Sequence, residues 1–94
     1  MASSYKIVSI NVRGLHDHNK RRKLYAWLNQ NKVDIAFLQE TFVTKNIENI
    51  VNSSYDGKMI HNVTNSPHSR GVSILFSKKI KNDIKIIDIH RDHE

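Results

Sequence analysis

The chain has 94 residues, which suffice for one small domain and exclude an enzyme built from two domains. It contains no cysteine, which excludes a disulfide framework, a disulfide-linked partner and a thiolate metal site. Fifteen Lys and Arg against nine Asp and Glu give a formal net charge of +6, which favours polyanions such as nucleic acid as partners.

The location of the protein is predicted from segments that the sequence lacks. No apolar run approaches the ~18 residues of a membrane span, and residues 1–5 do not read as a signal peptide. We therefore expect an intracellular protein, nuclear or cytoplasmic, that is neither secreted nor bound to a membrane. The absence of cysteine fits a reducing compartment.

The first predicted element is a strand from Lys6 to Ile10. Ile7, Val8 and Ile10 are apolar, β-branched and on both sides of the alternation, which is typical of a central strand buried on two faces. A polar loop follows, in which Asp17 and Asn19 are favourable helix caps.

The segment from Lys20 to Asn31 predicts an amphipathic helix, because Leu24, Trp27 and Leu28 recur at helical spacing. We expect Trp27 and Leu28 in the core; a base-stacking role for Trp27 is the alternative. Basic residues in the first helical turn oppose the helix macrodipole by roughly a few tenths of a kcal/mol. The run is therefore either a solvated helix start or a surface that contacts phosphate, and it consists of Lys20, Arg21, Arg22 and Lys23.

A second buried strand is predicted from Asp34 to Leu38, parallel to the first. Strand, helix and strand within about 35 residues form a βαβ unit, so the fold class is α/β. Parallel neighbours end at the same edge of a sheet, so Asn11 and Glu40 should meet there, where α/β folds place their ligands.

The rest of the sequence predicts shorter elements separated by turns. In chain order these are a short helix around 47–51, a turn over 53–57, a weak strand over 58–63, a loop over 65–70, a strong strand over 72–76, a charged turn over 78–83 and a last strand over 84–89.

Asn11 and Glu40 are the strongest candidates for chemistry. A carboxylate at this edge can hold Mg²⁺, and an amide beside it can donate to a phosphate oxygen or orient a carboxylate. The alternative is structural, with Glu40 pairing at a strand end and Asn11 serving a turn. Other metal sites, at His16 and His18 or at His90 and His93, lack a complete ligand set.

Three segments together carry a family resemblance: "KIVSINVRGL", "KRRKLYAWLNQNKVDIAFLQET" and "SRGVSILFSK". The chain resembles the endonuclease/exonuclease/phosphatase superfamily, which includes DNase I, and is most similar to the endonuclease of LINE-type non-LTR retrotransposons. The resemblance implies the amino-terminal portion of a four-layered α/β/β/α sandwich with a mixed sheet. Asn11 matches the Asn of the family's N-V/I-x-G-L motif and Glu40 the Glu of its L-Q-E-T motif, which implies catalytic roles for both and Mg²⁺ binding for Glu40.

The resemblance also implies groups that the sequence does not supply. The family active site uses a Tyr, an Asp-x-Asn pair, a later Asp and a terminal Asp-His, and none has a counterpart here. Residues 1–94 are therefore expected to be the first part of the domain, without its carboxyl-terminal part and inactive alone. A non-catalytic basic nucleic-acid-binding module and an element remnant without function are the alternatives.

DNA is the expected partner, and an intact element would carry a reverse transcriptase on the same chain. Arg13 stands where relatives often carry Asp or Asn, and its guanidinium would favour phosphate and oppose a nearby cation. The residues expected to contact the DNA backbone are Arg13, Lys20, Arg21, Arg22 and Lys23.

Overall fold

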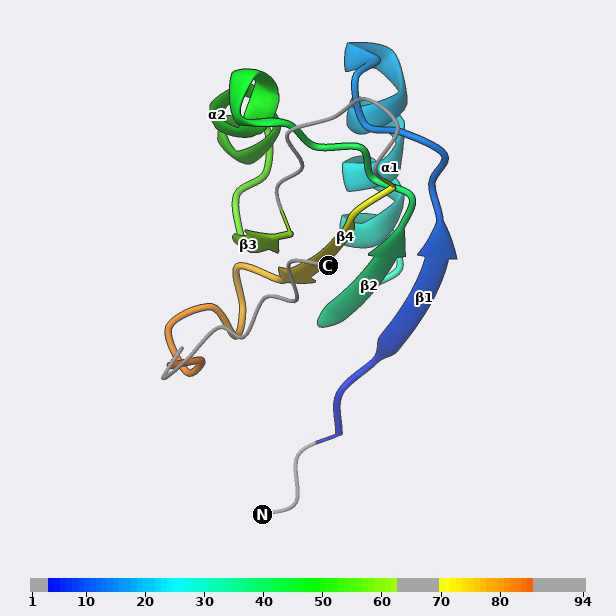
Figure 1. Cartoon of the computed structure of the whole chain (residues 1–94). Coiled ribbons are helices and arrows are strands. Elements are labelled where there is room, and N and C mark those ends of the chain that lie inside the picture. The colour runs from blue at the N-terminus through cyan, green and yellow to red at the C-terminus, as the bar shows by residue number, and fades with distance from the viewer. Residues whose placement is uncertain (1–3, 63–69, 86–94) are drawn as a thin grey trace.

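A computed structural model describes residues 4–62 and 70–85. These residues form an α/β arrangement of four strands and two helices (Figure 1). In chain order the elements are β1 (Ile7–Asn11), α1 (His18–Gln30), β2 (Ile35–Gln39), α2 (Lys45–Ser53), β3 (Lys58–His61) and β4 (Val72–Phe76).

The sheet begins with the expected βαβ unit. β1 pairs in parallel with β2, and because parallel strands need a long crossover, α1 connects them. β4 pairs antiparallel with both β2 and β3, so the strand order is β1-β2-β4-β3. The predicted α/β class and mixed sheet are confirmed.

The core lies between the sheet and the two helices, which cover the same face (Figure 1). Leu28 of α1 and Val51 of α2 pack with Leu38 of β2 and Leu75 of β4, and each is at most 1% exposed. Burying each such side chain stabilises the fold by about 1.5–3 kcal/mol.

Both ends of α1 have specific caps. The side chain of Asp17 accepts hydrogen bonds from the backbone N–H of Asn19 (2.8 Å) and of Lys20 (3.3 Å), which confirms its predicted capping role. At the other end Lys32 adopts φ 53°, and the N–H groups of Lys32 and Val33 donate to Asn29 and Leu28. These two hydrogen bonds form a Schellman motif, in which the position that Lys32 occupies favours glycine.

The buried face of α1 differs from the prediction. Leu28 is buried as expected, but Trp27 is 43% exposed, and Arg21 and Tyr25 take the inner positions with 4% and 5% exposure. Tyr25 is drawn inward because its ring packs at 5.1 Å from that of Tyr55 and its hydroxyl donates to the Val51 carbonyl (3.2 Å). The expectation for Trp27 is wrong because it assigned no tertiary partner to Tyr25.

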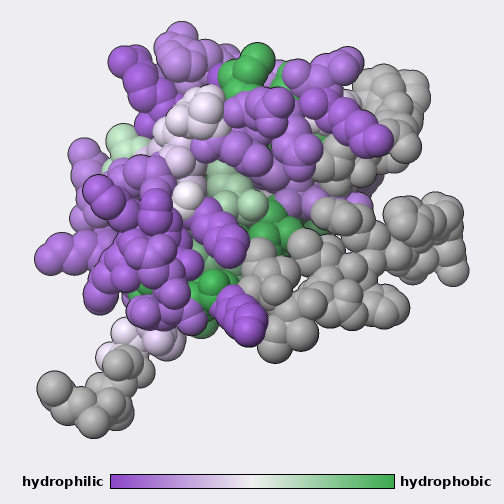
Figure 2. All heavy atoms as spheres, turned by 90° about the vertical axis from the view of Figure 1, so that its left-hand side faces the viewer, coloured by the Kyte–Doolittle hydropathy of each residue, from purple (hydrophilic) through white to green (hydrophobic). Residues whose placement is uncertain are grey.

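The two-faced burial expected for the first strand is also wrong. β1 is outermost among the four described strands, and on the face away from the helices Ile7 is 55%, Phe37 41% and Val72 52% exposed. The helices cover only one face, so side chains that alternate to the other face remain accessible. The side of the molecule drawn in Figure 2 is mostly hydrophilic, with hydrophobic residues grouped near its middle.

The short helix, the strong strand over 72–76 and the turn over 78–83 are confirmed, whereas β3 ends at His61 rather than at residue 63. Ile84 and Lys85 do not form a strand, and residues 86–89, like most of the loop over 65–70, lie outside the described residues. No helix in the described part of the chain is long and apolar enough to span a membrane.

Candidate active site at the carboxyl ends of β1 and β2

Asn11 and Glu40 lie side by side, as their positions in the sequence predict. Asn11 is the last residue of β1 and pairs in register with Gln39, the last residue of β2, so Glu40 leaves the sheet at the same edge. The Asn11 Nδ2 donates a hydrogen bond to the Glu40 Oε2. Their meeting is confirmed, and their catalytic role stays a prediction.

The Asn11 amide also organises the turn behind it. Its Oδ1 accepts a hydrogen bond from the Arg13 backbone N–H at 3.2 Å. The structural interpretation of Asn11 is therefore correct as well, since the same side chain holds the turn with its oxygen and the carboxylate with its nitrogen. Both ends of the amide are engaged, so its orientation is determined.

Left-handed backbone conformations cluster at this edge. Arg13, Glu40 and Phe42 have φ of 51°, 56° and 53°, and they account for three of the four non-glycine residues with positive φ in the described chain. Such a conformation costs a non-glycine residue roughly 1–2 kcal/mol. Strain of this kind persists only where surrounding contacts impose it, and it concentrates at functional sites.

The contacts that impose these conformations join the two loops. The Val12 N–H donates to the Gln39 carbonyl (3.0 Å), that of Gly14 to Glu40 (2.6 Å) and that of Leu15 to Thr41 (3.1 Å). Parallel pairing thus continues beyond both strands as a ladder between the loops. These hydrogen bonds fix the backbone carbonyls of Glu40 and of the residues before and after it.

A third segment completes this edge, and sequence reasoning did not place it there. Ahead of β4, the Arg70 carbonyl accepts from the Phe42 N–H (2.7 Å) and the Gly71 carbonyl from the Thr41 N–H (3.4 Å). Arg70 is exposed and adds a positive charge to the rim. The available signal was the strand beginning at Val72, but its pairing with Gln39 is a long-range contact that local patterns do not reveal.

The donor set at this edge fits a hard cation held through one carboxylate. Glu40 is half-buried and its bond to Asn11 engages Oε2, so Oε1 can bind a ligand. Mg²⁺ commonly keeps several waters and uses one or two carboxylates together with substrate phosphates. No group of three or more His, Asp or Glu side chains forms a metal site within residues 4–62 and 70–85, so His16 and His18 do not complete one.

Arg21 is placed differently from the other basic residues of its run. It is 4% exposed, and its Nη1 donates to the carbonyls of Leu15 (2.7 Å) and His16 (2.9 Å). Its guanidinium therefore binds the loop between β1 and α1 and does not face outward toward a DNA backbone. The sequence did not distinguish it from Arg22, because the helical face that turns inward is decided by packing.

The rest of the basic run is accessible to different degrees. Lys20 is half-buried, and its Nζ donates to the Arg13 carbonyl at 2.9 Å, which ties α1 to the loop that follows β1. Arg13, Arg22 and Lys23 are exposed. Their exposure leaves these three side chains accessible to phosphates, and the contact itself stays a prediction.

A buried histidine lies away from this edge. The Nε2 of His61 lies 2.6 Å from the Asn52 Oδ1, which can only accept, so Nε2 carries the proton and Nδ1 faces the Ser73 hydroxyl at 2.5 Å. Burial lowers the pKa of His61, with Glu48 opposing that shift. Ser73 is 2% exposed, so this cluster joins β3, β4 and α2 rather than meeting a substrate. His90 and His93 lie outside the described residues.

The chain matches the model of a known protein family. A family model described as the Endonuclease/Exonuclease/phosphatase family matches residues 8–93. No curated protein matches the chain.

Proposed function

The chain belongs to the endonuclease/exonuclease/phosphatase family, a family of nuclease- and phosphatase-type hydrolases, and from this premise we propose that it carries the Mg²⁺-binding edge of a DNA-cleaving phosphodiesterase. The fold is consistent with this family, since an α/β chain with a parallel β1–β2 start matches the amino-terminal portion of a DNase I-like sandwich. The observation that carries the proposal is the hydrogen bond between Asn11 and Glu40 at the shared edge.

Each residue of this edge has a defined task in the proposal. Glu40 would hold Mg²⁺ through its carboxylate, and Asn11 holds that carboxylate in one orientation through Oε2. The bound metal would polarise the scissile phosphodiester. Arg13 attracts the phosphate from the adjoining turn. The loop ladder keeps these groups in place, which matters because misplaced catalytic groups lose most of their effect.

The resemblance further supports a retrotransposon-type endonuclease, since the sequence around Asn11 and Glu40 is most similar to that of LINE-type enzymes. The base and the second carboxylate that the family uses have no counterpart in these 94 residues. We therefore expect the chain alone to bind Mg²⁺ and DNA without cutting, and to require the rest of the domain, in an element that also encodes a reverse transcriptase, for turnover.

The metal-binding part is tested with the pure chain and Glu40→Gln. This variant keeps an oxygen that accepts from Asn11 but removes the charge, so the fold should remain while Mg²⁺-induced NMR shifts of the amides around residue 40 disappear. Glu48→Gln, on α2, is the matched control and should leave them unchanged. Equal Mg²⁺ shifts in wild type and Glu40→Gln would contradict the proposal.

The catalytic part is tested by plasmid nicking in Mg²⁺. Wild-type chain should show no nicking above buffer. Nicking that is lost in Glu40→Gln would show that the chain is itself a nuclease and that our expectation of inactivity is wrong. Nicking that survives in Glu40→Gln would indicate a contaminant or a different active site.

Nucleic-acid binding without catalysis is the second candidate, favoured by the exposed basic side chains of α1. The double variant Arg22→Ala/Lys23→Ala should reduce the slope of log K against log salt by about 2, because each phosphate contact contributes roughly 1. The control Lys45→Ala/Lys85→Ala removes two equally exposed charges elsewhere. If both double variants weaken DNA binding equally, α1 is not a specific nucleic-acid interface.

A further inference from the structure

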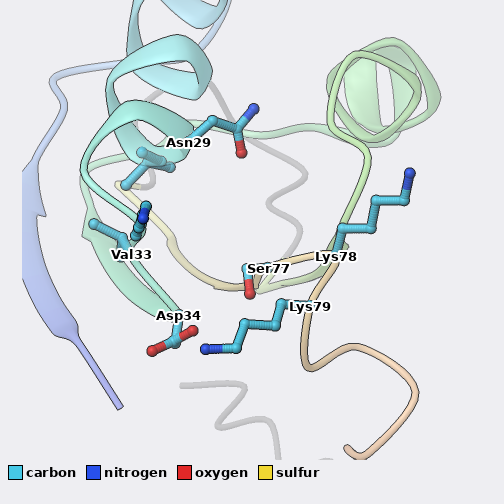
Figure 3. Close-up of a pocket in the computed structure, with 8 residues that line it drawn as sticks. Asn29, Val33, Asp34, Ser77, Lys78 and Lys79 are labelled. Carbon is cyan, nitrogen blue, oxygen red and sulfur yellow. The ribbon is translucent and has the colours of Figure 1, made fainter. Parts of the chain in front are cut away.

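A pocket lies at the end of the sheet opposite to Asn11 and Glu40. It opens between the last turn of α1, the segment that enters β2 and the turn that follows β4 (Figure 3). Its volume is about 220 Å³. Asp34, which lines it, directly precedes β2 and Glu40 directly follows β2, so the two sites are roughly 20 Å apart along this strand.

The pocket is strongly basic. Lys32, Lys78 and Lys79 line it with one acidic residue, Asp34, so three positive charges against one negative leave a net charge of +2. No salt bridge within residues 4–62 and 70–85 engages any of the three lysines. Asp34 is 6% exposed, and its Oδ2 accepts from the Lys6 backbone N–H at 2.8 Å, which fixes the carboxylate in the wall.

A neutral hydrogen-bonding group completes the polar side. The Ser77 Oγ is buried and has no hydrogen-bond partner in the described part of the chain. Its backbone is fixed, since the Ser77 N–H donates to the Asp34 carbonyl at 2.9 Å. Figure 3 shows Lys79 extending from this turn toward Asp34, with the Asn29 amide projecting from α1 above it. A buried hydroxyl without a partner is costly unless a ligand satisfies it.

Part of the lining is apolar. Leu28 and Val33, both less than 5% exposed, form it where α1 ends. A volume of about 220 Å³ corresponds to roughly seven waters, which exceeds what a bare inorganic anion needs. The pocket therefore suits an anionic group attached to a small organic body.

We propose that this pocket binds a phosphate monoester, carried either by a free nucleotide or by the terminal phosphate of a nucleic-acid strand. A monoester carries about −1.5 to −2 charges at pH 7 and three acceptor oxygens, which match a net charge of +2 and the unsatisfied Ser77 hydroxyl. A phosphodiester within a strand carries one charge and matches less well. This site is independent of the proposed Mg²⁺ site at Asn11 and Glu40.

The first test is titration of the full chain with AMP, followed by amide NMR and calorimetry, with adenosine as the control ligand. AMP should bind saturably and shift the amides of residues 77–79, and adenosine should not. AMP should bind more weakly at pH 5.5 than at pH 7.5, because the monoester gains a proton near pH 6. No saturation up to about 10 mM AMP, a Kd that corresponds to about −2.7 kcal/mol, would overturn the proposal.

The second test uses variants. Lys78→Gln/Lys79→Gln and Ser77→Ala should each weaken AMP binding about tenfold, because each removes hydrogen bonds to a charged group. Lys45→Gln, an exposed lysine on α2, should change it less than about twofold. Retained amide spectra show that the variants are folded, and Lys79→Gln alone is the fallback if Ser77→Ala unfolds. Equal weakening by Lys45→Gln would show unspecific charge attraction and overturn the proposal.

A third comparison separates the two sources of the ligand. Short oligonucleotides with and without a 5′-phosphate are titrated, and the shifts of residues 77–79 are followed. Shifts with AMP alone identify a free nucleotide, and shifts with AMP and the phosphorylated strand identify strand ends as well; both support the proposal. Equal shifts with the unphosphorylated strand would indicate backbone binding and overturn it. Glu40→Gln should leave all these results unchanged, so failure here is distinguishable from failure at the active edge.

Discussion

Replacing Arg21 by Met tests whether a buried cation holds the loop between β1 and α1. The substitution removes two hydrogen bonds from Nη1, to the carbonyls of Leu15 and His16, and each bond to a charged group contributes about 1.5–3 kcal/mol. Two terms oppose this loss. The Nε is buried without a partner among the described residues, and a buried charge loses its hydration. We expect a net destabilisation of about 2 kcal/mol.

The assay is thermal and urea unfolding of wild type, Arg21→Met and the control Arg22→Met. A loss of about 2 kcal/mol lowers the Tm of a domain of this size by roughly 8–16 °C. Arg22 is exposed, so Arg22→Met should change stability by less than about 0.5 kcal/mol while weakening DNA binding. If Arg21→Met is as stable as Arg22→Met and weakens DNA binding equally, Arg21 faces the solvent and the loop contact is refuted.

Three further predictions concern other parts of the fold. Burial lowers the pKa of His61 in the folded state, so its contribution to stability is complete above the unfolded pKa of about 6.5 and is lost as pH falls below that value. The Tm should therefore decline from pH 7 to pH 5. This decline should be smaller in His61→Gln and as large as in wild type in the exposed-site control His18→Gln. Lys32→Gly should raise the free energy of unfolding by about 0.5–1 kcal/mol, measured in urea, because glycine accepts the left-handed conformation that ends α1; a loss would contradict the Schellman assignment. Gly57→Ala should destabilise by about 3 kcal/mol, because its Cβ would lie 2.0 Å from the Phe76 carbonyl oxygen, and a wild-type Tm would show that this strand edge can move apart.

The elements that the sequence predicted well are those with a strong local pattern. The βαβ start follows from two short apolar runs and a segment of helical period, and Asp17 marks the start of the helix because its side chain caps free N–H groups. Predictions that needed a partner elsewhere in the chain were less accurate. Trp27 was assigned to the core, but the contacts of Tyr25 with Tyr55 and Val51 turn a different face of α1 inward.

The candidate site likewise has features that local patterns predict and features that depend on long-range contacts. That Asn11 and Glu40 meet is predictable, because parallel strands of known length end at one edge. The third segment of that edge, Arg70 and Gly71, depends on β4 pairing with β2, a contact between residues more than 30 positions apart in the chain. Arg21 is buried and Arg22 is exposed because packing decides which face of α1 turns inward.

Local sequence patterns predict the α/β class, the order of the first elements along the chain and the meeting of Asn11 and Glu40 at one edge of the sheet. These depend on hydrophobic period, capping and strand polarity, which act over a few residues. Three features depend on long-range packing: β1 lies at one edge of the described sheet, Arg21 binds a loop, and Lys32, Ser77 and Lys79 share a pocket with Asp34. Such contacts join residues distant in the chain, and the packing of the whole core selects them together.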